Sequence, residues 1–123
     1  MDESERAAIT RVARAYYVAM ATGDGAAIRE LFDGDACFWG RRDGADVRRN
    51  LSEFVSMVET PAIESPMKVD IEIVDSSGEL AMVKLVDLFR GRMYTDYLIL
   101  ARKDGVWKII VKTFWAHDEG AGE

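Results

Sequence analysis

The last third of the chain holds the two residues with the clearest potential for chemistry, Asp96 and Lys112. They lie in β-rich runs on either side of Asp104-Gly105, a dipeptide typical of a tight hairpin turn. Inside a protein, two opposed charges stay ionised when they are paired, and such a pair can position a polar ligand or accept a proton. On the outer face of a sheet the same pair would be a cross-strand ion pair that contributes less than about 1 kcal/mol. We take this outer-face pair as the simpler interpretation.

The register of the hairpin decides which residues face each other, because a slip of one residue turns a strand over. A two-residue turn at Asp104-Gly105 places Asp96 opposite Thr113 and Tyr97 opposite Lys112. A three-residue turn that includes Lys103 places Asp96 opposite Lys112. We favour the second, because a type I turn followed by a glycine with positive φ suits this sequence. A bulge in the last strand would exchange its inward and outward residues.

His117 is the only histidine in the chain. A catalytic dyad of histidine and carboxylate would have to pair it with Asp118 or with a carboxylate across a pocket mouth. A histidine so near the end of the chain is more simply interpreted as exposed. One histidine and one cysteine, Cys37, leave only carboxylates as metal ligands, and no EF-hand spacing occurs. We therefore expect no metal and no cofactor.

The net charge of −6 disfavours binding to nucleic acid or to anionic membranes. Basic residues are scattered, apart from Arg41-Arg42 and Arg48-Arg49. These four could hold an anion, but short charge runs are usually solvated, and we interpret them as a loop and a helix start. The sequence contains no glycine-rich phosphate loop, no nucleophile elbow and no Ser-His-Asp order, which argues against the common hydrolases and nucleotide enzymes.

Hydrophobic periodicity predicts the elements that must position these residues. A helix over residues 4–21 is capped by Ser4 and stopped by Thr22-Gly23, and Asp24 caps a short second helix. We then expect a strand at 36–39, a polar loop at 41–46, a third helix at 47–59, and strands at 67–75, 80–89, 92–103 and 106–115. The order ααβαββββ predicts an α+β fold, with the helices on the concave face of a curved antiparallel sheet.

One domain covering residues 1–123 is expected from the length, with a frayed tail at 118–123. No apolar run approaches the roughly 20 residues that span a bilayer. The first residues are acidic and polar, unlike a secretory signal. Together with the single cysteine, these features lead us to expect a cytoplasmic protein.

The element order and several motifs resemble the nuclear-transport-factor-2-like superfamily, and more closely its family labelled putative lumazine-binding. The matching segments are Tyr16-Tyr17 before Gly23-Asp24, Leu31-Phe32, Thr95-Asp96-Tyr97-Leu98, Asp104-Gly105-Val106-Trp107-Lys108-Ile109 and Lys112-Thr113-Phe114. The resemblance implies a cone-shaped fold shared with ketosteroid isomerases, polyketide cyclases and scytalone dehydratase. Because this fold hosts many unrelated functions, it implies a pocket more than a reaction.

The resemblance also implies roles for individual residues. In ketosteroid isomerases a tyrosine of the first helix donates a hydrogen bond to the developing enolate while an aspartate moves the proton. Tyr16 could take the first role, and Asp96 or Asp87 the second. Adjacent helix residues point about 100° apart, so of Tyr16 and Tyr17 one should face the core and the other its edge. The simpler interpretation of Tyr16 is a core aromatic residue whose hydroxyl group has a partner.

Large apolar side chains are numerous enough that some should line a cavity for a planar or greasy ligand. The candidate ligand contacts are Tyr16, Phe32, Trp39, Phe54, Asp96, Lys112 and Phe114. We expect a small-molecule-binding domain with a hydrophobic cone-shaped pocket, which forms a homodimer through the apolar patch left over on the convex face of the sheet. The alternative is a cofactor-free isomerase, dehydratase or cyclase acting on a small ring compound, with Asp96 as base, Tyr16 as hydrogen-bond donor and His117 as a further candidate. A third possibility is a dimerisation scaffold without a ligand.

Overall fold

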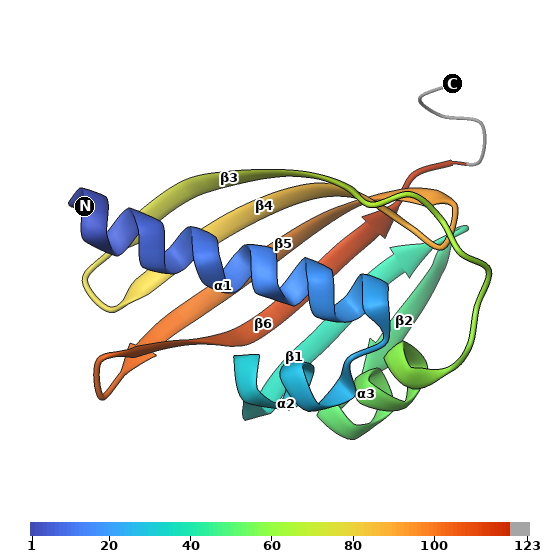
Figure 1. Cartoon of the computed structure of the whole chain (residues 1–123), viewed down its shortest axis with the longest axis horizontal. Coiled ribbons are helices and arrows are strands. Elements are labelled where there is room, and N and C mark those ends of the chain that lie inside the picture. Colours follow the sequence, from blue (N-terminus) through green and yellow to red (C-terminus); the bar gives the residue numbers. More distant parts are fainter. Residues whose placement is uncertain (119–123) are drawn as a thin grey trace.

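The computed structural model describes residues 1–118, so of the expected tail only Asp118 lies within the described residues. The elements are α1 (Glu3–Thr22), α2 (Gly25–Leu31), β1 (Phe32–Arg42), β2 (Ala45–Arg49), α3 (Leu51–Glu59), β3 (Lys68–Ser77), β4 (Leu80–Phe89), β5 (Arg92–Lys103) and β6 (Val106–Ala116). Within residues 1–118 the strands form one curved sheet in the order β2-β1-β6-β5-β4-β3, in which only the β1–β6 pair is parallel (Figure 1). The predicted α+β fold and the meander of the last four strands are confirmed, with β2 as an additional strand.

Helix α1 lies across the concave face of the sheet, and α2 and α3 cover the end of that face next to β1 and β2 (Figure 1). The side chain of Asp2, rather than the predicted Ser4, caps α1 by accepting a hydrogen bond from the backbone N–H of Glu5. Gly23 ends the helix as predicted, with the left-handed φ of 76° that favours glycine. The stripe of α1 that faces the sheet is buried, and it includes both Tyr16 and Tyr17.

The segment after α2 differs most from the prediction. Strand β1 is eleven residues long, and a tight turn at Asp43-Gly44 joins it to β2, where a polar loop and the start of a helix were expected. Both turn residues have positive φ, 53° and 79°, which matches the twist of a two-residue hairpin. Helix α3 starts only at Leu51, because Asn50 and Glu53 form a reciprocal capping box there.

A bulge in β6 decides which of its residues face the helices. At the Asp104-Gly105 turn the hairpin is of the two-residue type, with Lys103 opposite Val106. Between Leu100 and Ile99 the register shifts by one residue, so Ile109 and then Lys112, Phe114 and Ala116 are buried. Asp96 therefore lies opposite Phe114, and both predicted registers are wrong for this pair.

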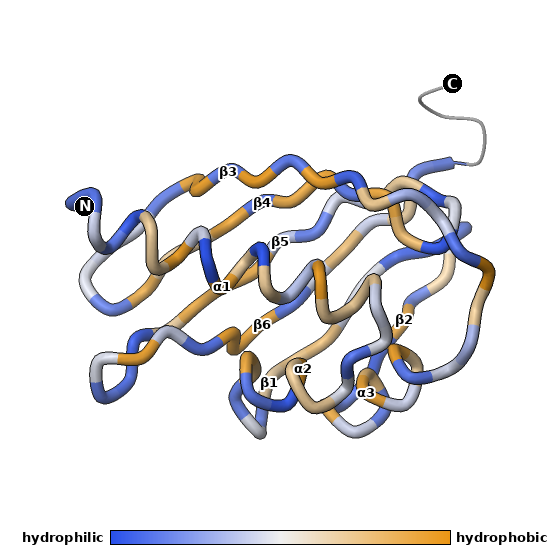
Figure 2. Tube along the Cα trace, viewed as in Figure 1, coloured by the Kyte–Doolittle hydropathy of each residue, from blue (hydrophilic) through white to orange (hydrophobic). Residues whose placement is uncertain are grey.

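The core lies between α1 and the concave face of the sheet. Hydrophilic residues gather at the hairpin turns, whereas hydrophobic residues run along the strands and α3 (Figure 2). The rings of Phe32, Phe38 and Phe54 pack against one another at centroid distances of 4.9–5.7 Å. These contacts fill the end of the cone beneath α2 and α3.

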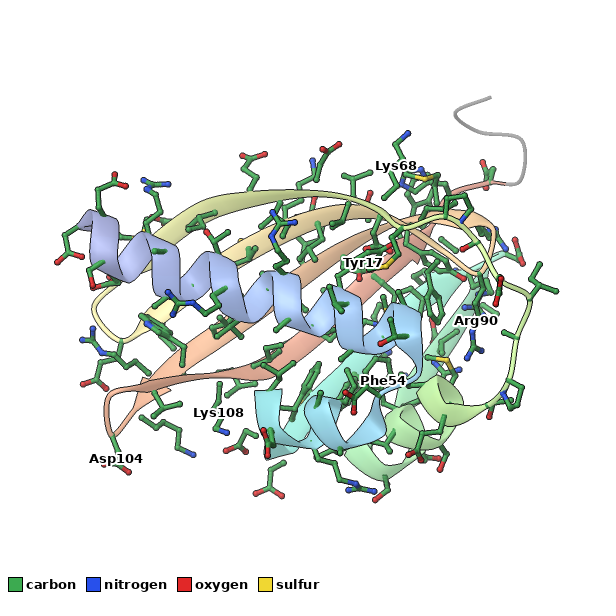
Figure 3. All side chains as sticks on the ribbon, viewed as in Figure 1. Tyr17, Phe54, Lys68, Arg90, Asp104 and Lys108 are labelled. Carbon is green, nitrogen blue, oxygen red and sulfur yellow. The ribbon has the colours of Figure 1, made fainter. Side chains whose placement is uncertain are left out.

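Tyr17 and Arg90 fix the long connection between α3 and β3. The Tyr17 hydroxyl donates to the carbonyl oxygen of Leu88 at 2.7 Å and accepts from the backbone N–H of Lys68 at 2.9 Å (Figure 3). Arg90 donates to the carbonyl oxygens of Met57 and Thr60, both at 2.8 Å. Tyr17 therefore has a structural role, which leaves Tyr16 as the tyrosine available to the interior.

Candidate functional site

Three ionisable side chains lie in a diagonal row across neighbouring strands on the concave face. Asp87 of β4 is paired with Tyr94, two residues before Asp96 on β5. Asp96 is paired with Phe114, two residues after Lys112 on β6. Such diagonal neighbours are about 7–8 Å apart at their backbones, within reach of one another's side chains. All three residues are buried, with exposed fractions of 0%, 1% and 5%, so the outer-face ion pair is wrong.

Tyr16 reaches this row from α1. Its hydroxyl group donates a hydrogen bond of 2.7 Å to Oδ2 of Asp96 and lies 3.4 Å from the sulfur of Met20. Burial raises the pKa of Tyr16 well above its ordinary value, and the negative charge of Asp96 raises it further. Tyr16 is therefore a neutral donor whose partner is Asp96.

Asp87 is the most unusual group of the site. Neither of its carboxyl oxygens has a hydrogen-bond partner among residues 1–118. Burial, followed by the negative charge of Asp96, raises the pKa of Asp87 to about 9. In the structure no hydrogen bond joins the carboxyl groups of Asp87 and Asp96. A hydrogen bond between them would raise the pKa of Asp87 further. Asp87 is thus a carboxylic acid that keeps its proton at neutral pH.

Lys112 enters the interior without an acidic partner at ion-pair distance in the described part of the chain. Its ammonium group lies 4.5 Å from the ring centre of Phe54 and 4.7 Å from that of Phe114. Burial lowers the pKa of Lys112, while the charges of Asp96 and Asp87 oppose this effect. The aromatic faces partly compensate for the lost water, as cation–π contacts do.

Phe114 depends on a glycine in the neighbouring strand. A Cβ atom at Gly40 would lie 2.3 Å from the Phe114 ring, a distance that no packing rearrangement of two adjacent strands can absorb cheaply. The absence of a side chain at Gly40 therefore lets Phe114 lie flat over β1. Gly40 continues β1, whereas the sequence pattern predicted a strand end at this position.

A small pocket opens onto this row. It is lined by Met20, Arg42, Arg49, Met57, Asp87, Phe89, Tyr94, Asp96, Lys112 and Phe114. The volume open to the centre of a water molecule is about 10 Å³, which is room for roughly one water. Long, flexible methionine and arginine side chains close the pocket, so a larger ligand must displace them.

A larger hollow of about 480 Å³ lies beneath the connection between α3 and β3 and shares Met20 and Phe89 with the small pocket. Its lining consists mainly of residues 58–67 and the end of α1, and it includes no buried carboxyl or ammonium group. The groups able to do chemistry therefore lie in the smaller pocket, and the hollow adjoins it behind Met20.

The other predicted site residues lie elsewhere. Trp39 is 42% exposed on the convex face, because it alternates with the buried Phe38, so its predicted place in the pocket is wrong. His117 is half-buried, with Nε2 2.8 Å from Oγ1 of Thr95 and its ring against Trp115, on the face opposite Asp96. Phe32 and Phe54 belong to the packed aromatic core. Tyr16, Asp96, Lys112 and Phe114 do come together.

Sequence reasoning did not place Tyr94, Arg42 and Arg49 in the pocket, although it named the four arginines as a possible anion site before preferring a solvated loop and helix start. Tyr94 could have been found from strand alternation, since it lies two residues before Asp96. The arginines could have been found from Asp43-Gly44, which is the same kind of turn signal as Asp104-Gly105. Its flanking residues are polar, and this masked the hairpin.

A curved sheet closed by a long N-terminal helix, with polar groups on its concave face, defines a nuclear-transport-factor-2-like protein. The chain belongs to the family described as putative lumazine-binding, whose model matches residues 4–115. It is 26% identical over 116 residues to a protein named aldolase FrzH from Cladobotryum sp, with 93% of each chain covered.

Solved structures agree on the fold. An NTF-2 like protein of unknown function from Silicibacter pomeroyi superposes with a TM-score of 0.85 at 28% identity, covering 95% of this chain and 100% of the other. A ketosteroid isomerase-like protein from Erwinia carotovora atroseptica has a TM-score of 0.74 at 18% identity, covering 95% and 99%. Within residues 1–118, no helix is long and apolar enough to cross a membrane.

Proposed function

We propose that this protein binds a small carbonyl compound in the polar pocket and moves a proton at the carbon next to the carbonyl group. An isomerase, dehydratase, cyclase or aldolase could each use such a step. The observation that carries the proposal is the buried row of Asp87, Asp96 and Lys112, in which Asp87 has no hydrogen-bond partner within residues 1–118. Buried ionisable groups with strongly shifted pKa values gather at functional sites. They are rare at other positions, because burying them destabilises the fold.

The two carboxyl groups suit opposite tasks. Asp96 acts as the base that removes the proton, held in place by the hydrogen bond from Tyr16. Asp87, protonated at neutral pH, donates a hydrogen bond to the carbonyl oxygen as negative charge develops there. Lys112 adds a positive charge next to this oxygen in a site of low dielectric. When the surroundings of two neighbouring titratable groups push their pKa values apart, one group usually serves as the catalytic acid and the other as the base.

The proposal modifies the role expected of Tyr16. Its hydroxyl group is directed at Asp96, so Tyr16 positions the base, and Asp87 becomes the donor to the substrate. The relative named an aldolase supports proton transfer next to a carbonyl group, because an aldol reaction begins with that step. A scaffold without a ligand is less well supported, since it gives no reason for three buried ionisable side chains.

Hydrogen–deuterium exchange tests the proposal without knowledge of the natural substrate. Small ketones such as cyclopentanone and cyclohexanone are incubated with the protein in D₂O, and deuterium incorporation next to the carbonyl group is followed by NMR. We expect exchange above the buffer rate, with a loss of about 10²–10⁴-fold in Asp96→Asn. Asp87→Asn keeps a donor and should retain more activity. The rate should fall as the pH rises through about 9, because Asp87 then loses its proton.

Asp70→Asn is the matched control, since Asp70 is an exposed carboxylate on β3. It should exchange ketone protons like the wild type. Absence of exchange with every ketone, combined with saturable binding in the pocket, would leave a binding protein without catalysis. Lumazine belongs in that binding panel because the family description names it.

We also propose a homodimer through the convex face of the sheet. Trp39, Tyr97 and Trp115 are 42%, 39% and 50% exposed on this face, where the strand register places Trp39 and Tyr97 on either side of Thr113. Contiguous exposed aromatic residues on a sheet face are typical of a self-complementary interface. Light scattering of the eluting protein should give the mass of two chains, and Tyr97→Glu should give one.

Val106→Glu is the control for the dimer, because Val106 is 53% exposed at the β5–β6 turn, where it pairs with Lys103, six residues along β5 from Tyr97. A wild-type protein that elutes as a monomer at all concentrations would contradict the dimer. We further propose a cytoplasmic location, supported by the single cysteine, Cys37. Fractionation of cells that express the protein tests this.

A further inference from the structure

The four arginines of the β1–β2 hairpin are divided between the two faces of the sheet. In the hairpin register Phe38 pairs with Arg49, and Arg42 with Ala45. Residues two apart on a strand share a face, so Arg42 lies on the concave side with Gly40 and Phe38, and Arg49 lies there opposite Phe38. Arg41 and Arg48 point the other way, where both form ion pairs with Asp46.

The two inward arginines line the pocket, and within residues 1–118 neither forms an ion pair. Nη2 of Arg42 donates to the Tyr94 hydroxyl at 2.8 Å, but the Nε–H of Arg42 is buried without a hydrogen-bond partner in the described part of the chain. The side chain of Arg49, which is half-buried, forms no hydrogen bond or ion pair within residues 1–118. Buried polar groups of native proteins nearly always have partners, so each such unpartnered group requires an explanation.

The neighbouring acids are already engaged. Asp43 is paired with Arg92 at 2.7 Å. Glu53 accepts the backbone N–H of Asn50 in the capping box of α3. Asp43 still attracts Arg42 electrostatically, and Glu53 attracts Arg49, but within residues 1–118 neither carboxylate forms an ion pair with the inward arginines.

The charges that line the pocket do not balance. Three basic side chains, Arg42, Arg49 and Lys112, line the pocket together with two acidic ones, Asp87 and Asp96, and burial followed by the charge of Asp96 raises the pKa of Asp87 to about 9. Burial lowers the pKa of Lys112, and Arg49 and Arg42 lower it further against the opposing charges of Asp96 and Asp87. Burial, followed by the charge of Arg42, also lowers the pKa of Arg49, while Glu53 opposes this effect. The chain as a whole carries a net charge of −6, so a general excess of basic residues does not explain why three basic side chains gather at this pocket.

We propose that Arg42 and Arg49 form an anion subsite at the pocket, and that the substrate is a carbonyl compound which also carries a carboxylate group. This inference rests on the proposed function for the carbonyl part and on the arginine geometry for the anionic part. Guanidinium groups match carboxylates through pairs of parallel hydrogen bonds. The arginines would hold the carboxylate while the reacting carbon lies against Asp96 and Asp87.

Benzoate and benzamide test the subsite, because they share shape and differ in charge. In both compounds the carbon next to the carbonyl group carries no hydrogen, so neither is a substrate for the proposed exchange. Binding is measured by NMR titration of the whole chain at neutral pH. We expect benzoate to bind at least about tenfold more tightly than benzamide, and Arg42→Gln or Arg49→Gln to remove that preference. Benzamide binding should not change in these variants.

Arg41→Gln and Arg48→Gln are matched controls, since each removes one positive charge from the same hairpin on the outer face. They should leave benzoate binding within about twofold of the wild type, as expected for exposed charges. Equal binding of benzoate and benzamide would overturn the subsite, and so would equal losses in the inner and outer variants. Selective benzoate binding without ketone exchange would support the subsite while the proposed catalysis fails. Ketone exchange without benzoate preference would overturn the subsite alone.

Discussion

The concave face of the sheet has two halves of opposite character. At the end with the β3–β4 and β5–β6 turns, Val83, Leu98, Leu100 and Ile109 are fully buried and wholly apolar. At the other end the same three strands, β4, β5 and β6, carry Asp87, Asp96 and Lys112, which are almost as deeply buried. Both halves have the same backbone geometry and the same covering helix, so they differ in chemistry rather than in architecture.

The difference separates what folds the chain from what the chain can do. Burial of apolar side chains drives folding, whereas burial of an unpartnered carboxyl or ammonium group opposes it. A sheet that needed only to fold could carry leucine at all these positions. Polar groups that weaken stability are typical of sites under functional demand. Substitutions in the two halves should therefore have effects of opposite sign.

The largest effect is expected in the apolar half. Leu100→Ala should lower the free energy of unfolding by about 2–5 kcal/mol, because it removes buried methyl groups and leaves a cavity. Urea denaturation measures the change. A loss below about 1 kcal/mol would mean that this half is loosely packed and that the contrast between the halves is false.

In the polar half, Asp87→Leu should have the opposite sign. It replaces an unpartnered buried carboxyl group by an apolar one, so the free energy of unfolding should rise by about 1–3 kcal/mol. The same variant should lose ketone exchange. Asp70→Leu, at an exposed position, separates this effect from a general gain in hydrophobicity. Destabilisation by Asp87→Leu would show that the carboxyl group supports the fold.

The pH dependence of stability tests the protonation of Asp87. Its folded-state pKa of about 9 lies above the ordinary value of 3.8, so between these values the folded state binds the extra proton. As the pH rises from about 5 to 8, the free energy of unfolding of the wild type should therefore fall relative to that of Asp87→Asn. The full slope for one proton is about 1.4 kcal/mol per pH unit. Denaturation curves of the two proteins at several pH values measure the difference. Parallel curves would contradict a raised pKa.

The smallest stability effect is expected at the arginines. Arg49→Gln and Arg48→Gln should each change the free energy of unfolding by less than about 0.5 kcal/mol, since neither makes a buried ion pair in the described chain. Benzoate binding should nevertheless separate the two variants. A large loss of stability in Arg49→Gln would assign that residue to the fold instead of the pocket.

Local signals in the sequence were sufficient for most of the elements. The periodicity of α1 with the glycine at position 23, and the strand patterns at 80–89 and 92–103, predicted these elements almost to the residue. The Asp104-Gly105 turn was also correctly located. The hairpin at Asp43-Gly44 was missed because its flanking residues are arginines, and their hydrophobic pattern is too weak to indicate a strand.

The sequence by itself determined the order of the elements apart from β2, and it supplied the candidates Tyr16, Asp87, Asp96 and Lys112. Tertiary structure alone decided which of them meet. Since strand side chains alternate with a period of two, the single extra residue of the β6 bulge turns Lys112 and Phe114 inward, and no local pattern reveals that bulge. The burial that shifts the pKa of Asp87 likewise exists only when α1 covers the sheet. Chemistry of this kind depends on contacts between residues far apart in the chain, such as the hydrogen bond between Tyr16 and Asp96.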